Sequence, residues 1–282
     1  MPLELVETIA DLRSRVASRR PAGLVGLVPT MGALHEGHAS LIRRARTECA
    51  TVVVSIFVNP IQFDRHEDLE RYPRSLDVDT DLCRSLGVDL VFAPTVAEMY
   101  PAALECRVEV GRLADHLCGR YRPGHFSGVA TVVLKLFQIA QADRSYFGQK
   151  DGQQLAVVRR LVSDFNVPTT IVGVPTVREP DGLALSSRNQ RLNPEERRLA
   201  PALFHALHGV QAAVAAGTTS VDDLKQLASR HIPADSRLRL EYFEIVDPVD
   251  LQPVARVTGP VVAAGALWVG TTRLIDNVMI GV

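Results

Sequence analysis

The sequence predicts an α/β protein, with a parallel sheet covered by helices and then a smaller α+β domain. Two observations carry this prediction. Up to about residue 176, short apolar runs alternate with segments of helical periodicity, as in a parallel sheet covered on both faces. Beyond that point, a polar and turn-rich stretch leads to two helical segments and then three apolar strand-like runs. Because 282 residues suffice for two cores, we expect domains at 1–176 and 177–282.

Each element of the first domain follows from its local pattern. GLVGLVP (23–29) is short, apolar and bounded by glycine, which favours a buried strand. TVVVSIFV (51–58) is β-branched and aromatic and is ended by Asn59-Pro60. GVATVVLKLFQIA (128–140) is apolar almost all round, which predicts a helix in the core or at a subunit interface. The remaining expected helices are 3–17, 38–49, 75–86 and 152–165, and the remaining strands are 88–94, one that ends at 145–148, and 168–175.

The second domain is expected to follow the polar segment REPDGLALSSRNQRLNPEE. Helices are predicted over 195–216 and 221–230, and strands near 238–246, 261–269 and 272–280.

Composition excludes several classes of protein. The net charge is −1 and no long basic block occurs, which opposes a nucleic-acid-binding surface. No apolar run approaches the roughly 20 residues of a membrane span, and the N-terminus has no apolar signal-peptide core. The four cysteines make neither a CxxC pair nor a zinc-finger spacing, so reduced thiols in the cytoplasm are expected: Cys49, Cys83, Cys106 and Cys118.

Two histidines stand where the first long apolar strand gives way to a helix, in VPTMGALHEGH (28–38). HEGH superficially resembles the zinc motif HExxH, but His35 and His38 are three residues apart rather than four, and no third ligand is evident nearby. A structural role for either histidine alone is the other ordinary interpretation. The position after a strand favours a third: the helix N-terminus offers N–H groups to phosphate, and two imidazoles can donate hydrogen bonds to phosphate oxygens.

This HxGH arrangement points to nucleotidyl transfer, in which charge builds on the α-phosphate of a nucleoside triphosphate. Neither a P-loop motif nor GxGxxG is present. Two further segments supply complementary groups. FGQKDGQQL (147–155) places Lys150 and Asp151 at a strand-to-helix turn, and ALSSRNQRL (184–192) offers two hydroxyls and a guanidinium to the departing phosphates.

With these segments together, the chain resembles the pantothenate synthetase family almost end to end. The stretches that carry the resemblance are PTMGALHEGH (29–38), SIFVNPIQF (55–63), YPR (72–74), GHFSGVATVVLKL (124–136), YFGQKDGQQL (146–155), VGVPTVREPDGLALSSRN (172–189) and GTTRLIDN (270–277). The resemblance implies a Rossmann-like domain with a smaller C-terminal lid domain over the site, in a homodimer. It also implies ATP and Mg²⁺, with pantoate adenylated first and β-alanine then attacking the acyl carbon.

The resemblance also assigns residues. His38, His35 and Lys150 are implied to be catalytic, with His38 the candidate proton donor. Gln62 and Gln154 are implied to hold pantoate, and Gln62 to border β-alanine. Neutral amides would orient a carboxylate nucleophile without tying it up in a salt bridge. The residues implied to contact ATP are Met31, Gly32, Ala33, Leu34, His35, Glu36, Gly37, His38, Gly148, Gln149, Lys150, Asp151, Val177, Leu185, Ser186, Ser187 and Arg188.

Three positions depart from the family pattern. Gln149 stands where glutamate is usual, Gly152 replaces a bulkier residue, often tyrosine, and Leu185 replaces methionine. Leucine conserves volume, whereas Gln149 removes a negative charge beside Lys150, and Gly152 is expected to weaken the helix start by about 0.5–1 kcal/mol. Three other functions stay open at this stage: a sister HxGH nucleotidyltransferase, a nucleotide-binding regulator without catalysis, and, least consistent with the charge, a nucleic-acid-binding module.

Overall fold

The structure, a computed structural model, describes residues 2–281 and divides them into two compact units. The first unit comprises the chain up to Val110, Arg122–Gln149 and Val157–Pro175. The second comprises Gly111–Tyr121, Lys150–Ala156 and the chain from Thr176 onward. Two short segments within the predicted first domain, 1–176, therefore belong to the second unit. The predicted roles of catalytic domain and lid stay a prediction.

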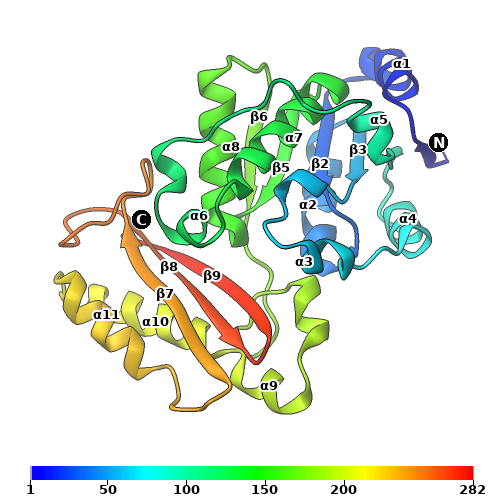
Figure 1. Ribbon diagram of the computed structural model, residues 1–282. Coiled ribbons are helices and arrows are strands. Elements are labelled where there is room, and N and C mark those ends of the chain that lie inside the picture. The colour runs from blue at the N-terminus through cyan, green and yellow to red at the C-terminus, as the bar shows by residue number, and fades with distance from the viewer. Residues whose placement is uncertain (1, 282) are drawn as a thin grey trace. The chain divides into compact units, whose positions relative to one another are not determined.

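The first unit contains a six-stranded sheet, ordered β1-β4-β3-β2-β5-β6, in which every neighbouring pair is parallel (Figure 1). Its strands are β1 (Glu4–Val6), β2 (Val25–Thr30), β3 (Thr51–Ile56), β4 (Leu90–Phe92), β5 (Arg144–Gly148) and β6 (Thr170–Val174). Strands β2, β3 and β4 are apolar and buried along nearly their whole length, as strands covered on both faces must be. The α/β fold class predicted from the sequence is confirmed.

Helices flank this sheet. The elements are α1 (Ile9–Arg19), α2 (Glu36–Glu48), α3 (His66–Glu70), α4 (Leu76–Ser85), α5 (Val96–Met99), α7 (His125–Ala140) and α8 (Gly152–Asp164), whose first turn belongs to the second unit. Helix α2 packs on β2, β3 and β5, while α7 packs on β2 and on α1. The core under α2 includes Val28, Ile42 and Val54, all completely buried. Most of α7 is buried, in agreement with its apolar sequence.

The second unit is an antiparallel three-stranded sheet covered by helices. Its strands, in the order β7-β8-β9, are β7 (Leu238–Val246), β8 (Val261–Val269) and β9 (Thr272–Ile280). Its helices are α6 (Leu117–Tyr121), α9 (Pro194–Leu199), α10 (Ala202–Ala215) and α11 (Val221–Arg230). Helix α10 packs on β8 and β9, and its buried leucines share one core with Ile245 and Leu267 of the sheet.

Two predicted elements were wrong in their extent. The helix expected over 3–17 begins only at Ile9, because Thr8 caps it by accepting a hydrogen bond from the Asp11 N–H (3.1 Å). The preceding Glu4–Val6 forms edge strand β1, paired with β4. The helix expected over 195–216 is interrupted at Ala200 and Pro201, since proline has no N–H with which to continue the helical hydrogen bonds.

Candidate functional site

The predicted nucleotide-binding stretch Met31–His38 is the loop that joins β2 to α2 in the first unit. It leaves the carboxyl end of a central parallel strand, where ligands of open α/β sheets bind. The backbone turns sharply there: Gly32 has φ +82°, which suits glycine, and Ala33 has φ +50°. Thr30 closes the turn, because its hydroxyl donates to the Ser55 carbonyl (2.7 Å) and accepts from the Gly32 N–H (3.2 Å).

A buried carboxylate holds this loop. Asp79 of α4 is 1% exposed and accepts hydrogen bonds from the N–H groups of Ala33 (2.8 Å) and Leu34 (2.7 Å). A side chain at position 32 would crowd it, because a Cβ there would lie 3.0 Å from an Asp79 carboxylate oxygen. Sequence reasoning missed Asp79. The available signal was an acidic residue on the face of α4 that also carries buried Thr80 and Cys83.

The two histidines form the N-terminal cap of α2. His35 is the N-cap residue, and its Nδ1 accepts from the Gly37 N–H (3.1 Å). The Nδ1 of His38 accepts in turn from the His35 N–H (3.2 Å), and the two ring centroids lie 4.2 Å apart. Because a backbone N–H can only donate, each Nδ1 carries a lone pair, so each neutral ring has its proton on Nε2. Both imidazoles therefore present an Nε2–H donor beside the helix N-terminus.

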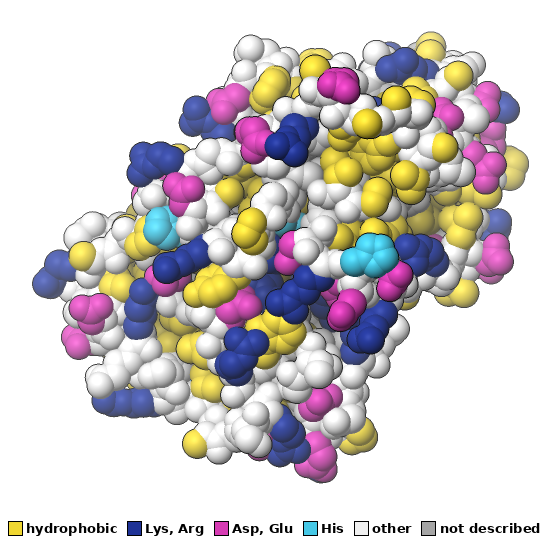
Figure 2. Space-filling model, viewed as in Figure 1, with side chains coloured by type: hydrophobic (Ala, Val, Ile, Leu, Met, Phe, Trp, Pro, Cys, Tyr) yellow, Lys and Arg dark blue, Asp and Glu magenta, His cyan; other side chains and the backbone are white. Residues whose placement is uncertain are grey.

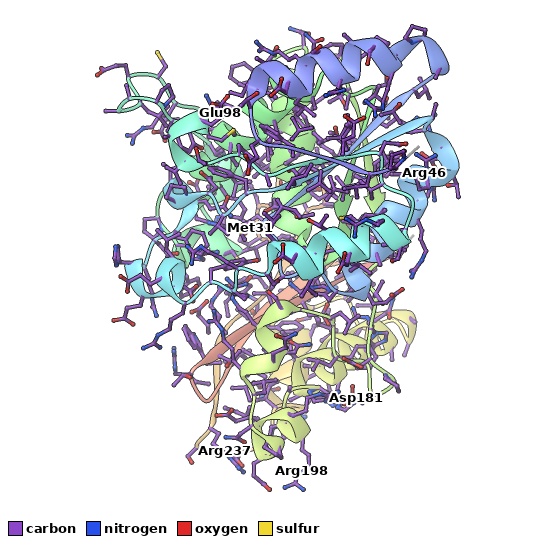
Figure 3. The ribbon with its side chains drawn as sticks, turned by 90° about the vertical axis from the view of Figure 1, so that its right-hand side faces the viewer. Met31, Arg46, Glu98, Asp181, Arg198 and Arg237 are labelled. Carbon is purple, nitrogen blue, oxygen red and sulfur yellow. The ribbon has the colours of Figure 1, made fainter. Side chains whose placement is uncertain are left out.

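Gln62 ends the short 3₁₀ helix η2 (Pro60–Gln62) and is buried. Its side-chain Oε1 accepts from Nδ2 of Asn59 (3.0 Å), and its Nε2 lies 2.9 Å from the sulfur of Met31, which Figure 3 labels. The structure thus brings together two predicted residues, Met31 and Gln62, that are 31 positions apart. Gln62 also lines a cavity of about 440 Å³ in the first unit, together with Asp64 and His125 among others.

The backbone of Gln62 is fixed from α7. His125 Nδ1 lies 2.7 Å from the Gln62 carbonyl, so that nitrogen carries the proton and donates. Arg122 donates to the other ring nitrogen of His125 (3.1 Å) and, through Nε, to Asp64 (2.8 Å). Burial raises the pKa of Asp64, but the charge and hydrogen bond of Arg122 outweigh it and hold that pKa below its usual value.

Lys150 and Asp151 lie in the 3₁₀ turn η4 (Gln149–Asp151), directly after β5. The Lys150 ammonium is 3.6 Å from an Asp151 carboxylate oxygen. Asn277 of β9 donates from Nδ2 to the Lys150 carbonyl (2.8 Å), and a Cβ on Gly152 would lie only 3.1 Å from the Asn277 amide. The glycine at 152 therefore lets the Asn277 amide pack closely against the backbone.

Adjacent glutamines on α8 differ in surroundings. Gln153 is buried and donates from Nε2 to the carbonyls of Leu113 and His116, both at 2.8 Å, so it serves as a structural tie within the second unit. Gln154, the predicted pantoate ligand, is half-buried beside it. The predicted ligand and a structural residue of the same type are thus neighbours in the chain.

The remaining predicted residues share one turn-rich segment of the second unit. The Leu185 N–H donates to the Val177 carbonyl (3.0 Å), which brings these two predicted positions side by side. Ser186 caps the 3₁₀ helix η5 (Ser187–Arg191), its hydroxyl accepting from the Arg188 N–H (3.3 Å). Arg178, paired with buried Asp276 through both guanidinium nitrogens (2.6 and 3.0 Å), braces the segment. The sequence analysis did not single out Arg178 or Asp276.

The predicted residues divide between the units. Met31–His38, Gln62, Gly148 and Gln149 belong to the first, and Lys150, Asp151, Gln154, Val177 and Leu185–Arg188 belong to the second.

We predict that Asp79→Ala lowers the free energy of unfolding by about 2–5 kcal/mol, because two partly buried N–H groups lose their acceptor. The amides of Ala33 and Leu34 will also exchange with deuterium much faster than in the native chain. Chemical denaturation and amide exchange measure both effects. Asp77→Ala, an exposed position on the same helix, is the matched control and is expected to change neither. Unchanged exchange at Ala33 and Leu34 in Asp79→Ala would contradict the role given to Asp79.

Comparison with known proteins gives a consistent result. Residues 4–279 match the family model described as Pantoate-beta-alanine ligase. A pantothenate synthetase from Moorella thermoacetica is 52% identical over 281 residues, covering 99% of both chains. A bifunctional pantoate ligase/cytidylate kinase from Thermosynechococcus vestitus is 55% identical over 97% of this chain, which spans 54% of that longer protein.

Solved structures agree. The pantothenate synthetase of Thermus thermophilus superimposes with a TM-score of 0.92 at 47% identity, covering 98% of this chain and 99% of that one. A pantoate-beta-alanine ligase from Francisella tularensis, complexed with beta-gamma ATP and beta-alanine, has a TM-score of 0.82 at 36% identity, covering 98% of this chain and 97% of that one.

Proposed function

The chain belongs to the pantoate–beta-alanine ligase family, and from this premise we propose that it joins pantoate to β-alanine at the expense of ATP. A carboxylate oxygen of pantoate bonds to the α-phosphorus of ATP, and the bond to pyrophosphate breaks. The amine of β-alanine then bonds to the acyl carbon of the pantoyl adenylate and loses a proton. The bond between the acyl carbon and the bridging oxygen breaks, and AMP leaves with that oxygen. Pantothenate, AMP and pyrophosphate are the products.

The cap of α2 is the observation that carries the proposal. Charge builds on the oxygens of the α-phosphate as the carboxylate attacks, and fixed donors stabilise that charge without having to reorganise. The Nε2–H groups of His35 and His38 are such donors, since both Nδ1 atoms accept backbone hydrogen bonds. The N-terminal end of α2 adds the partial positive charge of the helix dipole. We assign the loop Met31–His38 to ATP, with the Nε2–H of His38 as a hydrogen-bond donor to the reacting phosphates.

The other predicted residues complete the assignment. Lys150, Ser186, Ser187 and Arg188 bind the phosphates, with the ammonium and guanidinium offsetting the charge of departing pyrophosphate. Gly148, Gln149, Asp151, Val177 and Leu185 also contact ATP. Gln62 and Gln154 bind pantoate, and Gln62 borders β-alanine. Aligning the bound reactants is worth roughly 7–11 kcal/mol of the barrier.

Mg²⁺ enters the proposal as part of the MgATP substrate. Residues 2–281 hold no group of three or more His, Cys, Asp or Glu side chains placed to bind a metal ion. Such a cage is not needed, since Mg²⁺ is commonly held by substrate phosphates with one or two carboxylates. Two carboxylates lie within the predicted ATP site, and Asp151, next to Lys150, fits this role better than Glu36, which pairs with Arg43.

The proposed lid function of 177–282 follows from the chemistry of the intermediate. An acyl adenylate hydrolyses readily, so shielding it from water favours attack by β-alanine. Among the described residues, no helix combines the length and apolar character needed to cross a bilayer. The cytoplasmic location stays a prediction.

The direct test of the reaction supplies ATP and Mg²⁺ with pantoate and β-alanine, singly and together. We expect AMP and pantothenate to form in equal amounts only when both acids are present. With both acids present, continued turnover that releases pyrophosphate but no AMP would instead indicate a sister nucleotidyltransferase. A folded chain that binds ATP without turnover would indicate a regulator, and either result contradicts the proposal.

His38→Ala is expected to reduce the rate of adenylation by about 10²–10³, because one charge-stabilising donor is lost. Rapid-quench measurement of pyrophosphate release in a single turnover reports this step. His66→Ala removes a histidine that is largely exposed on α3 and should leave the rate unchanged. A native rate in His38→Ala would remove His38 from the mechanism.

A homodimer is part of the proposal. The first unit exposes large apolar side chains at Ile61, Val96 and Leu104, and Figure 2 shows hydrophobic side chains gathered on its visible face, around α5 and α7. Sedimentation equilibrium should give twice the mass of the chain, and Leu104→Asp should shift the equilibrium toward the monomer. A monomeric native chain at micromolar concentration would contradict this part.

A further inference from the structure

Gln62 can present either end of its amide to a ligand, and the two ends recognise opposite partners. Oε1 accepts hydrogen bonds, whereas Nε2 donates them. A carboxylate only accepts, so a glutamine that binds it must turn Nε2 toward it. In the structure Oε1 is engaged by Asn59 (3.0 Å), and Nε2 faces the sulfur of Met31 (2.9 Å). A thioether is a weak acceptor that a substrate oxygen can displace.

The amide of Asn59 has only one satisfactory orientation. Asn59 is 1% exposed, and its Nδ2 lies 3.3 Å from the Gly128 carbonyl on α7 as well as 3.0 Å from Gln62. Because a backbone carbonyl can only accept, the group that faces it must be the NH₂ end. Helix α7 comes this close because position 128 is glycine: a Cβ there would lie 2.3 Å from the Ile61 carbonyl oxygen.

Tyr100 engages the opposite end of Asn59. Its hydroxyl donates to Oδ1 of Asn59 at 2.8 Å. Burial raises the pKa of Tyr100, so its proton stays in place throughout the neutral range. The ring is held separately, by Phe57 at 6.1 Å between centroids and by the Lys135 ammonium 5.5 Å from the ring centroid. The hydroxyl can therefore be removed while the ring stays packed.

We propose that Tyr100 is a positioning residue that acts through Asn59 to fix Gln62 as a hydrogen-bond donor to pantoate. The hydroxyl of Tyr100 and the carbonyl of Gly128 orient Asn59, and Asn59 occupies Oε1 of Gln62, which leaves Nε2 for the substrate. In this series of hydrogen bonds each side chain donates to the next, so all of the bonds run in the same donor-to-acceptor direction. The inference rests on the proposed function, because it takes pantoate as the ligand of Gln62.

Tyr100→Phe tests this inference in the full chain. The variant keeps the ring and removes only the donor, so we expect the KM for pantoate to rise about threefold to tenfold, the effect of losing one net hydrogen bond. The KM for ATP and kcat should stay within about twofold of their native values. A twofold change is smaller than the loss of one net hydrogen bond produces. Tyr146→Phe is the matched control, since it removes another buried tyrosine hydroxyl of the first unit, one that donates to Glu48 (2.9 Å). It should leave the KM for pantoate unchanged.

A double-mutant cycle separates positioning from a general structural effect. If Tyr100 acts through Gln62, then Tyr100→Phe has no further effect on the KM for pantoate in a Gln62→Ala background. If Tyr100→Phe does not fold, Asn59→Asp serves instead. Aspartate has nearly the same shape but cannot donate to Oε1, so Gln62 turns its NH₂ end inward, and the KM for pantoate should rise more than about tenfold.

The outcomes are distinct. A native KM for pantoate in Tyr100→Phe, an equal rise in the KM for ATP, or a full effect that persists in the Gln62→Ala background each overturns the inference while the proposed function stands. A native chain that makes no pantothenate overturns the proposed function, and the inference with it.

Discussion

The hydrogen bonds from Ala33 and Leu34 to Asp79 are the interaction on which the rest of the site depends. A loop that leaves a buried strand has no neighbouring strand to satisfy its N–H groups, and an unpaired buried N–H costs about 1–3 kcal/mol. Asp79 satisfies two of them at once. With that turn fixed, the chain reaches His35 in the extended conformation that a helix cap requires. The placement of both imidazoles follows from the cap.

Buried polar side chains therefore build this site in two steps. Asp79 fixes the backbone of the β2–α2 loop. The side-chain hydrogen bonds from Tyr100 to Asn59 and from Asn59 to Gln62 fix the amide of Gln62. These two sets of contacts adjoin where Nε2 of Gln62 faces the sulfur of Met31, which belongs to the β2–α2 loop. The groups that we propose to face pantoate there, among them Gln62, are neutral. Neutral donors orient a carboxylate nucleophile without lowering its reactivity as a salt bridge would.

The sequence predicted what local pattern and spacing encode. Apolar runs such as 51–58 indicated strand β3, and the glycines and histidines of 32–38 marked the start of α2. The sequence did not predict the roles of Asp79 and Tyr100, because both depend on contacts with residues about 40 positions away, which no local pattern records. Strand β1 was predicted as helix because its three residues carry too little pattern to outweigh the helical periodicity of the residues that follow. Its pairing with β4 is a long-range contact that the local sequence does not record. The division of the predicted site residues between two units likewise appears only once the chain is folded.

The central claim is that the β2–α2 loop supports adenylation of pantoate before β-alanine is needed. Positional isotope exchange tests it most directly. ATP carrying ¹⁸O in the bridge between its α- and β-phosphorus atoms is incubated with the enzyme, Mg²⁺ and pantoate, without β-alanine and with pyrophosphate retained. The account predicts that the label moves into non-bridging positions of the β-phosphate only when pantoate is present. No movement of label in an enzyme that makes pantothenate under the same conditions plus β-alanine would contradict a reversible adenylate step.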